Sequence, residues 1–385
     1  MVLAKTPDRI VDRKQEIGTL VSDLADSSKN VNYGLIGFRR IGKTTILQEV
    51  AKQLTGKGLI VVSIDFSLRK YDPAGFFKDM LNETSRGDYR VAGKKEQVLD
   101  DVRAGLNKLK DLTRARVRLE ISVDQTTGSP TITPMPYLKE AERDYSILFR
   151  STFEYVSQIA ERSGRRVVVM LDEFQTITEW KRYAGLEAIT EHLKHVIEAR
   201  GNVCYVVSGS RAHFMRNLLS SGGSPLFGLF NIMEISYLEE KPSKELFRMN
   251  DPSASDREAK EAYDLVSGHP FYLIALATSR RKGETMKEAY LRSLTSAAGS
   301  LNLYVKYVLT EDTGTYAKGP IMSQVLRALA SKPMSVGEIA RVAEVKLTSL
   351  PKFLNQLIEM DLVKKDGKVY SLVDRVVADY LKLNP

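Results

Sequence analysis

A nine-residue loop carries the residue types that phosphate chemistry needs. Residues 37–45 read GFRRIGKTT, which matches the pattern Gly-x-x-x-x-Gly-Lys-Thr. Glycines let backbone N–H groups turn inward around a phosphate, and a helix that follows adds unpaired donors at its N-terminus. Lys43 can supply a point charge to the β- and γ-phosphates, and the Thr44 hydroxyl can ligate Mg²⁺. The residues expected to bind a nucleotide here are Gly37, Arg39, Arg40, Ile41, Gly42, Lys43, Thr44 and Thr45.

An acidic pair, Asp172-Glu173, follows the apolar run Val167–Leu171. A buried strand that delivers two carboxylates to its C-terminal end is costly unless a cation lies there. We expect Asp172 to hold Mg²⁺ and Glu173 to orient and polarise an attacking water. Acids that complement a helix dipole would explain one carboxylate but not the apolar strand that feeds both. With Lys43, the pair predicts ATP binding and hydrolysis, with ADP as the product.

The first two-thirds of the chain alternates short apolar runs with longer amphipathic segments. This pattern predicts an α/β fold of the P-loop NTPase, AAA+-like type, with a parallel sheet flanked by helices. Continuous apolar runs are typical of strands buried on both faces. We expect the loop at 37–44 to lead into a helix at 45–54. The expected strands are 32–36, 59–66, 167–171, 203–207 and 231–236.

A long stretch, residues 70–165, separates the second and third expected strands. Its charge and turn patterns predict a helix near 94–112, a hairpin at 114–123 and 131–133, and a helix near 138–161. We interpret the part from about 85 to 135 as an insertion into an ATPase domain that spans residues 1–238.

The last third of the chain is predicted to be helical. Residues 239–312 are expected to form a helical lid, and residues 318–385 a C-terminal winged helix-turn-helix domain. The second prediction follows from short helices at 321–330, 336–342 and 349–360 and a hairpin around the turn Asp366-Gly367. Such a domain can bind duplex DNA or dock a protein, and both alternatives stay open. The candidate DNA contacts are Ser349, Lys352, Asn355, Lys364, Lys365 and Lys368.

Composition limits the remaining possibilities. The 385 residues carry a formal net charge of +9, which favours polyanionic partners. No apolar run approaches the roughly 18–20 residues that cross a bilayer, so we expect no membrane contact. The single cysteine, Cys204, lies in an apolar stretch and favours a reducing, cytoplasmic compartment. His192 and His195 have a spacing that could ligate a metal, but a solvated helix face explains them better.

The strand at 203–207 leads into Ser208-Gly209-Ser210-Arg211. In ATPases with this strand arrangement, a polar residue at this point senses the γ-phosphate. Ser210 and Arg211 are therefore candidate sensors. An ordinary helix N-cap serine followed by a solvent-facing arginine is the alternative.

Together these residues resemble the archaeal ATPase family, a branch of the AAA+ and STAND-type ATPases. The resemblance begins with residues 10–17 (IVDRKQEI) and ends with residues 268–273 (GHPFYL). It implies that Val11, Asp12 and Arg13 lie near the adenine, and that His269 and Pro270 lie close to the nucleotide under the lid. Without the family, Gly268-His269-Pro270 is simply a helix-breaking turn.

One position departs from the family pattern. The resemblance also includes residues 224–228 (SPLFG). In the family an arginine usually follows this stretch, and here that position is Leu229. An arginine that reaches the γ-phosphate contributes on the order of 10³–10⁵ in rate, so we expect slow hydrolysis unless Arg211 or Arg216 substitutes. Slow turnover favours a nucleotide-dependent switch, with a protein partner or self-association left open. The alternatives are a DNA-binding, initiator-like ATPase and, less well supported, a small-molecule kinase.

Overall fold

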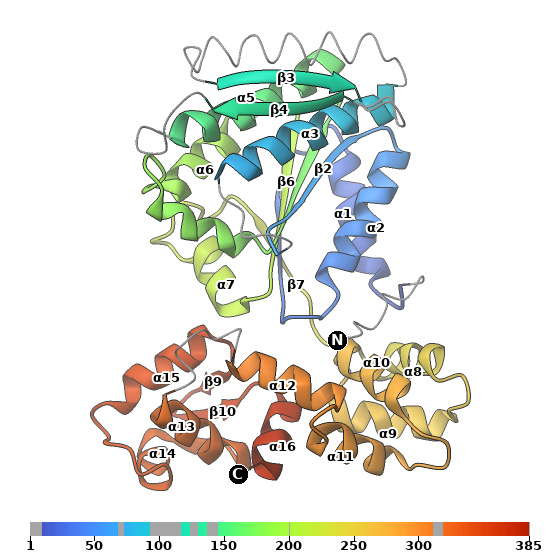
Figure 1. The fold of residues 1–385 in the computed structure, drawn as a ribbon, viewed down its shortest axis with the longest axis vertical. Coiled ribbons are helices and arrows are strands. Elements are labelled where there is room, and N and C mark those ends of the chain that lie inside the picture. The colour runs from blue at the N-terminus through green and yellow to red at the C-terminus, as the bar shows by residue number, and fades with distance from the viewer. Residues whose placement is uncertain are drawn as a thin grey trace.

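The computed structural model describes residues 10–67, 73–92, 117–123, 130–136, 145–199, 201–310 and 319–384. In Figure 1 a sheet and its helices form the upper lobe, and helices from the last third of the chain form the lower lobe. No helix in the described ranges is long and apolar enough to span a bilayer.

The central sheet has the parallel strand order β2-β5-β6-β1-β7. The strands are β1 (Tyr33–Ile36), β2 (Ile60–Asp65), β5 (Val167–Asp172), β6 (Val203–Gly209) and β7 (Asn231–Glu234). All five predicted strands are present, within two residues of their expected ends. β6 lies between β1 and β5, with Leu35 opposite Ser208 and Leu171 opposite Val207. The loop after β1 and the acids that end β5 therefore lie at one edge of the sheet.

Helices cover both faces of the sheet, which explains its continuous apolar runs. One face packs on α1 (Lys14–Ala25) and α2 (Lys43–Gly56), and the other on α3 (Pro73–Ala92), α5 (Tyr145–Ser163), α6 (Ile189–Glu198) and α7 (Ala212–Ser220). Val168 and Met170 of β5 join the first core, whereas Val167, Val169 and Leu171 join the second. Because successive strand residues face opposite sides, both sets must be apolar.

The long stretch between β2 and β5 contains the predicted hairpin, with β3 (Val117–Val123) antiparallel to β4 (Pro130–Pro136). In Figure 1 the hairpin lies across the top of the sheet lobe, next to α3. Helix α3 was not predicted, and it extends through the expected start of the insertion near residue 85. The helix predicted at 94–112 lies outside the described residues, and the one predicted at 138–161 is described from Tyr145 on, as α5.

The lower lobe begins with five helices between residues 240 and 310, and we call this segment the lid. They are α8 (Glu240–Asn250), α9 (Asp256–Val266), α10 (Pro270–Ser279), α11 (Met286–Thr295) and α12 (Ser300–Thr310). The C-terminal segment follows with α13 (Pro320–Ser331), β8 (Met334–Ser335), α14 (Val336–Val342), α15 (Leu350–Glu359), β9 (Val363–Asp366), β10 (Val369–Leu372) and α16 (Arg375–Leu383).

The C-terminal segment has the three helices and the hairpin expected of a winged helix. The short strand β8 pairs with β10 and completes a three-stranded antiparallel sheet, and α16 is an additional helix. One hydrophobic cluster continues from the lid into this segment, and α16 packs against α9, α11 and α12. The lid and the C-terminal segment therefore share a core.

Candidate nucleotide site

The phosphate loop depends on two glycines for different reasons. Gly42 has φ 104° and is the N-cap residue of α2, which begins at Lys43 rather than at the expected Thr45. Residues other than glycine rarely adopt such a φ, because their Cβ clashes with the backbone. A Cβ at Gly37 would lie 2.6 Å from the Ile235 carbonyl oxygen, so only glycine fits there. The loop thus presents the N-terminus of α2 to the cavity.

Lys43 lies inside the loop. Its Nζ donates hydrogen bonds to the carbonyl oxygens of Gly37 at 2.9 Å and of Phe38 at 3.0 Å. Burial lowers the pKa of the Lys43 ammonium below its ordinary value, and the Glu173 and Asp172 carboxylates oppose this shift. Lys43 is thus held where a phosphate at the loop would meet its charge.

Thr44 and Asp172 come together as the sequence predicted. Thr44 Oγ1 donates to Asp172 Oδ2 at 2.5 Å, although the two residues come from different elements. The Ser208 hydroxyl and the Glu173 N–H donate to the other oxygen, Asp172 Oδ1. A hydroxyl and a carboxylate are oxygen donors of the kind that Mg²⁺ prefers, so this pair fits the metal. Ser208 was not predicted, although its place beside the acidic strand could have indicated it.

Glu173 is half-buried and has the left-handed φ of 53°. Ser210 Oγ donates to Glu173 Oε2 at 2.6 Å, and Gln175 Nε2 donates to the same oxygen at 2.5 Å. Ser210 therefore contacts the acidic pair and is not the cap of α7. The N-cap residue of α7 is Arg211, whose side chain makes no cap hydrogen bond and lies over the Phe214 ring.

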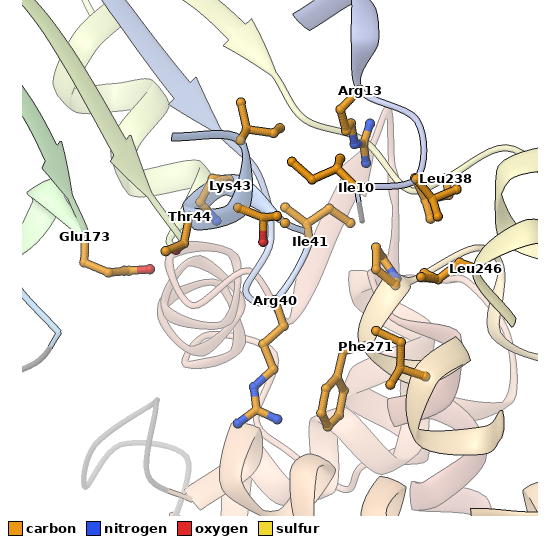
Figure 2. Close-up of a pocket in the computed structure, with 16 residues that line it drawn as sticks. Ile10, Arg13, Arg40, Ile41, Lys43, Thr44, Glu173, Leu238, Leu246 and Phe271 are labelled. Carbon is orange, nitrogen blue, oxygen red and sulfur yellow. The ribbon is translucent and has the colours of Figure 1, made fainter. Parts of the chain in front are cut away.

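A cavity of about 360 Å³ opens beside the loop. Figure 2 shows Glu173 and Thr44 on one side of it and Leu238, Leu246 and Phe271 on the other. One end of the cavity is thus polar and the other apolar, as a triphosphate joined to an aromatic base requires. The lining includes the predicted Val11, Arg13, Arg40, Ile41, Gly42, Lys43, Thr44, Thr45, Glu173 and Pro270, with Ile10, Ile46, Leu238, Leu246, Phe271 and Ile274 in addition.

Several predicted nucleotide contacts do not line this cavity. Gly37 and Arg39 belong to the loop but face elsewhere, and Asp12 is exposed. Arg13 reaches the cavity wall, where its guanidinium donates to the Ser236 carbonyl oxygen and pairs with Glu16.

His269 contacts the outer side of the phosphate loop. It is fully buried, and its Nε2 lies 3.2 Å from the Arg39 carbonyl oxygen. Burial lowers the pKa of His269 to about 3, so the ring is neutral at physiological pH. Its ring centroid lies 4.2 Å from that of Tyr272. His269 therefore supports the loop backbone and does not line the cavity.

Two loop arginines point toward the lid. The Arg39 guanidinium donates to the Tyr307 hydroxyl and lies over that ring, with 5.3 Å from Cζ to the centroid. Arg40 lies over the Phe271 and Tyr304 rings, at 4.3 Å and 4.7 Å. In Figure 2 Arg40 points toward Phe271 and away from Lys43. These aromatic partners were not predicted, because nothing in the local sequence joins residues some 230–270 positions apart.

The remaining candidates do not line the nucleotide cavity. Arg216 pairs with Glu234 at 2.7 Å, and Leu229 is half-buried. His192 and His195 line a separate cavity between α5 and α6, and the described residues contain no group of three or more potential metal ligands. Among the candidate DNA contacts Ser349 is half-buried, and the exposed ones are Lys352, Asn355, Lys364, Lys365 and Lys368.

Comparison with known proteins places these features in a family. Over the whole chain the fold is similar to that of a Walker-type ATPase of Pyrococcus abyssi, at 18% identity, a TM-score of 0.67 and coverage of 97% of this chain and 96% of the other. It is also similar to the ORC2 protein of Aeropyrum pernix, solved as ADPNP and ADP complexes, at 12% identity, a TM-score of 0.54 and coverage of 98% and 96%.

An uncharacterised protein of Methanocaldococcus jannaschii is 24% identical over 230 residues, which are 56% of this chain. The match spans about half, 48%, of that relative's length. The model of a family described as an ATPase domain predominantly from Archaea matches residues 10–276, more than two-thirds of the chain. The chain therefore belongs to the archaeal ATPase family.

Proposed function

We propose that this protein is a regulatory ATPase that binds Mg-ATP, hydrolyses it slowly and changes the docking of its lid between the ATP and ADP states. The observation that carries the proposal is the division of one loop. Lys43 and Thr44 face the acidic strand, whereas Arg39 and Arg40 contact the lid. The two pairs are joined by a short stretch of backbone. A nucleotide bound at Lys43 and Thr44 would therefore shift the positions of Arg39 and Arg40.

The proposed chemistry follows from the polar end of the cavity. The N-terminus of α2 and Lys43 would bind the phosphates, and Glu173 would accept a proton from the attacking water. Thr44 and Asp172 would hold Mg²⁺, which neutralises phosphate charge when bound. The apolar end, with Leu238, Leu246 and Phe271, would take the base.

The proposed signal reaches the C-terminal segment through a chain of side-chain contacts. His269, which touches the loop at the Arg39 carbonyl, stacks on Tyr272. The Tyr272 hydroxyl donates to Asp374 Oδ2 at 2.5 Å, and Asp374 caps α16 through the N–H groups of residues 376 and 377. This path joins the phosphate loop to the last helix through two buried rings and the half-buried Asp374.

A second contact joins the C-terminal segment to the sheet lobe. Asp361, which follows α15, accepts a hydrogen bond from the His213 N–H in the first turn of α7, at 2.9 Å. Helix α7 follows Ser210, the residue that touches Glu173. The C-terminal segment therefore contacts the lid through Asp374 and the sheet lobe through Asp361.

Slow turnover is part of the proposal. Leu229 stands where the family usually has an arginine. Arg216 is engaged with Glu234, and Arg211 lies over Phe214. Both candidate arginines therefore have other partners in this structure, so the transition-state charge would have to be stabilised mainly by Lys43, the loop amides and the bound Mg²⁺.

The test uses the full chain with Glu173→Gln and Lys43→Ala. Glu173→Gln should bind Mg-ATP and lose turnover by about 10²–10⁴-fold, because the general base is removed. Hydrogen exchange of α12 and α16 should then differ between Glu173→Gln with ATP and the parent with ADP. Lys43→Ala should neither bind Mg-ATP nor show a nucleotide-dependent difference in hydrogen exchange. Identical hydrogen exchange in the ATP and ADP states would contradict the proposed switch. Parental turnover of Glu173→Gln would contradict the assignment of Glu173 as the general base.

A second candidate function is duplex DNA binding by the proposed winged-helix unit, residues 318–385, beside the proposed lid at 239–312 and ATPase domain at 1–238. The supporting observation is the exposure of Lys352 on α15 and of Lys364, Lys365 and Lys368 around the β9–β10 turn.

Binding of this kind should weaken steeply as salt rises, because phosphate contacts release counterions. The slope is that of the logarithm of the binding constant against the logarithm of the salt concentration. Lys364→Ala combined with Lys365→Ala should reduce it by the amount expected for the loss of roughly two phosphate contacts. The exposed lid residues Lys282 and Lys287, changed together to alanine, serve as the charge-matched control. If no DNA binding is detected at physiological salt, the DNA-binding proposal is wrong. The same surface would then be a candidate site for a protein partner or a second copy of the chain.

A further inference from the structure

Gln175 lies two residues after Glu173, in a 3-10 helix at Phe174–Arg182. Its side chain is buried, and its Nε2 donates to Glu173 Oε2 at 2.5 Å. Ser210 from the end of β6 donates to the same oxygen. Among the described residues, the hydrogen bonds to the Glu173 carboxylate all run to Oε2. One oxygen is therefore held from two elements, Oε1 accepts no hydrogen bond from the described residues, and Glu173 lines the cavity.

The orientation of the Gln175 amide is set by Glu173. Its other end, Oε1, is buried and has no hydrogen-bond partner within the described ranges. Buried acceptors without a partner are rare because they forgo their hydration. Turning the amide over would place Oε1 against the carboxylate, where two acceptors repel. The fold thus leaves a carbonyl unpaired in order to give Glu173 a donor.

Strand β6 makes room for this amide. A Cβ at Gly209 would overlap both Gln175 Oε1 and Met215 Cγ, so a larger residue would displace the Gln175 side chain. The backbone contributes as well, because Glu173 has φ 53° and turns the chain sharply between the strand and the 3-10 helix. The spacing of Glu173 and Gln175, the small Gly209 on β6 and the left-handed backbone of Glu173 therefore all favour the hydrogen bond between Gln175 and Glu173.

We propose that Gln175 is a positioning residue for ATP hydrolysis, which together with Ser210 fixes the Glu173 carboxylate so that Oε1 meets the attacking water. The inference rests on the proposed function. In the step, the water oxygen bonds to the γ-phosphorus, its proton passes to Glu173, and the bond to the β-γ bridging oxygen breaks with its electrons on ADP. Gln175 touches none of these reacting atoms and acts through the carboxylate.

The charged surroundings decide which substitution is informative. Lys43 interacts electrostatically with Glu173 and Asp172, and more weakly with Arg39 and Asp361. Ser210 contributes only a neutral hydroxyl from β6. A carboxylate introduced at position 175 would therefore meet Glu173 without a new cation between them, and two carboxylates that share a site do not both ionise readily.

The experiment compares Gln175→Ala and Gln175→Glu with the parent in steady-state ATP hydrolysis from pH 5 to 9. Gln175→Ala should lower kcat by on the order of tenfold to a hundredfold with KM little changed, because a misplaced base loses its geometry. Gln175→Glu keeps the side-chain shape but replaces the amide donor with an acceptor, so it should lower kcat at least as much as Gln175→Ala.

Controls separate this inference from its premise. Gln48→Ala removes an exposed glutamine from α2 and should change neither kcat nor the profile. If Glu173→Gln is inactive while both Gln175 variants keep the parental kcat and pH profile, the positioning role is overturned and the ATPase proposal stands. A loss of stability with parental kcat per folded molecule also overturns it. Parental turnover of Glu173→Gln instead removes the proposed function itself.

Discussion

The phosphate loop has two halves that face different parts of the molecule. Its C-terminal half turns toward the sheet, where Lys43 contacts the loop carbonyls and Thr44 contacts Asp172. Its other half turns toward the lid, where Arg39 and Arg40 lie over aromatic rings. The first half offers charge and oxygen ligands, and the second offers stacking. One loop is thus built both to bind phosphate and to hold a neighbouring lobe.

The two sides also differ in how completely their polar groups are satisfied. On the lid side, Arg40 Nη1, His269 Nδ1 and Asp361 Oδ2 are buried without hydrogen-bond partners among the described residues. On the sheet side, Lys43, Thr44 and Asp172 all have partners, and within the described ranges Gln175 Oε1 is the unpaired buried atom beside the acidic pair. Unpaired buried groups reduce the stability of the contacts around them. The lid junction is therefore the part that should rearrange at the lowest free-energy cost.

Lys43→Ala tests the sheet-facing half and should have the largest effect. Mg-ATP at a thousandfold excess over its Kd should stabilise the parent by about 4 kcal/mol, and the variant should lose this stabilisation. Denaturant unfolding with and without Mg-ATP measures it. Lys52→Ala, an exposed lysine of α2, is the matched control. A variant that keeps the ligand-induced stabilisation would show that the phosphates bind elsewhere.

His269→Gln tests the lid-facing half through pH. Burial lowers the pKa of His269 to about 3, whereas a histidine of the unfolded chain titrates near 6.5. Below pH 6.5 the unfolded chain binds a proton that the folded chain does not. The stability due to neutral His269 is therefore complete above pH 6.5 and is lost as the pH falls toward 3. Between pH 6.5 and 4.5 the loss should be about 2–3 kcal/mol.

The glutamine variant cannot titrate, and its amide can still donate to the Arg39 carbonyl. It should therefore lose less stability than the parent over the same pH range. Burial raises the pKa of Asp374 and of Asp361, which acts in the opposite direction, so the difference between variant and parent is the quantity to measure. His195→Gln on the exposed face of α6 is the control. Parallel pH curves for parent and His269→Gln would contradict a neutral buried ring.

Tyr272→Phe sharpens the comparison within the lid. It removes the donor to the Asp374 carboxylate, which should lower the free energy of unfolding by about 1.5–3 kcal/mol. Tyr290 makes a similar bond from α11 to Asp379 of α16, at 2.9 Å, but has no ring contact with His269. Tyr290→Phe should therefore also destabilise the chain and leave ATP affinity unchanged, whereas Tyr272→Phe should alter both. Equal effects on ATP affinity would break the proposed path from loop to α16.

The sequence predicted the sheet side of the site far better than the lid side. Lys43, Thr44 and Asp172 belong to short motifs whose strand and helix context is local, and the parallel sheet then brings them to one edge. Gln175 stood in the same motif, but its role depends on the space that Gly209 leaves on a neighbouring strand. Local patterns therefore found the ligands and missed the contacts that orient them.

The lid side depends on tertiary contacts that no local pattern encodes. The aromatic partners of Arg39 and Arg40 come from α10 and α12, and the cap on α7 comes from Asp361 in the C-terminal segment. Residues 73–92 were not predicted as a helix, although they bury one face against β2 and α5. The unexpected shared core of lid and C-terminal segment has the same origin, because apolar faces reveal burial but not the partner.

The smallest expected effect is the coupling between Arg40 and the aromatic residue beneath it. A guanidinium over a ring contributes about 0.5–1 kcal/mol at exposed sites and about 2 kcal/mol when desolvated. Arg40 is partly buried and lies 4.3 Å from the Phe271 centroid, so a double-mutant cycle of Arg40→Leu and Phe271→Ala should give about 1 kcal/mol in the nucleotide-free protein.

A control cycle pairs Arg40→Leu with Tyr183→Ala, whose ring makes an edge-to-face contact with Tyr145 within the sheet lobe, and it should show additivity. Repeating the first cycle with Mg-ATP then tests the division of the loop. Since Arg40 also lines the nucleotide cavity, bound ATP should change its coupling to Phe271 measurably. A coupling energy that is the same with and without ATP would mean that the two halves of the loop act independently, and the lid would then be a fixed wall of the site and not a moving part of a switch.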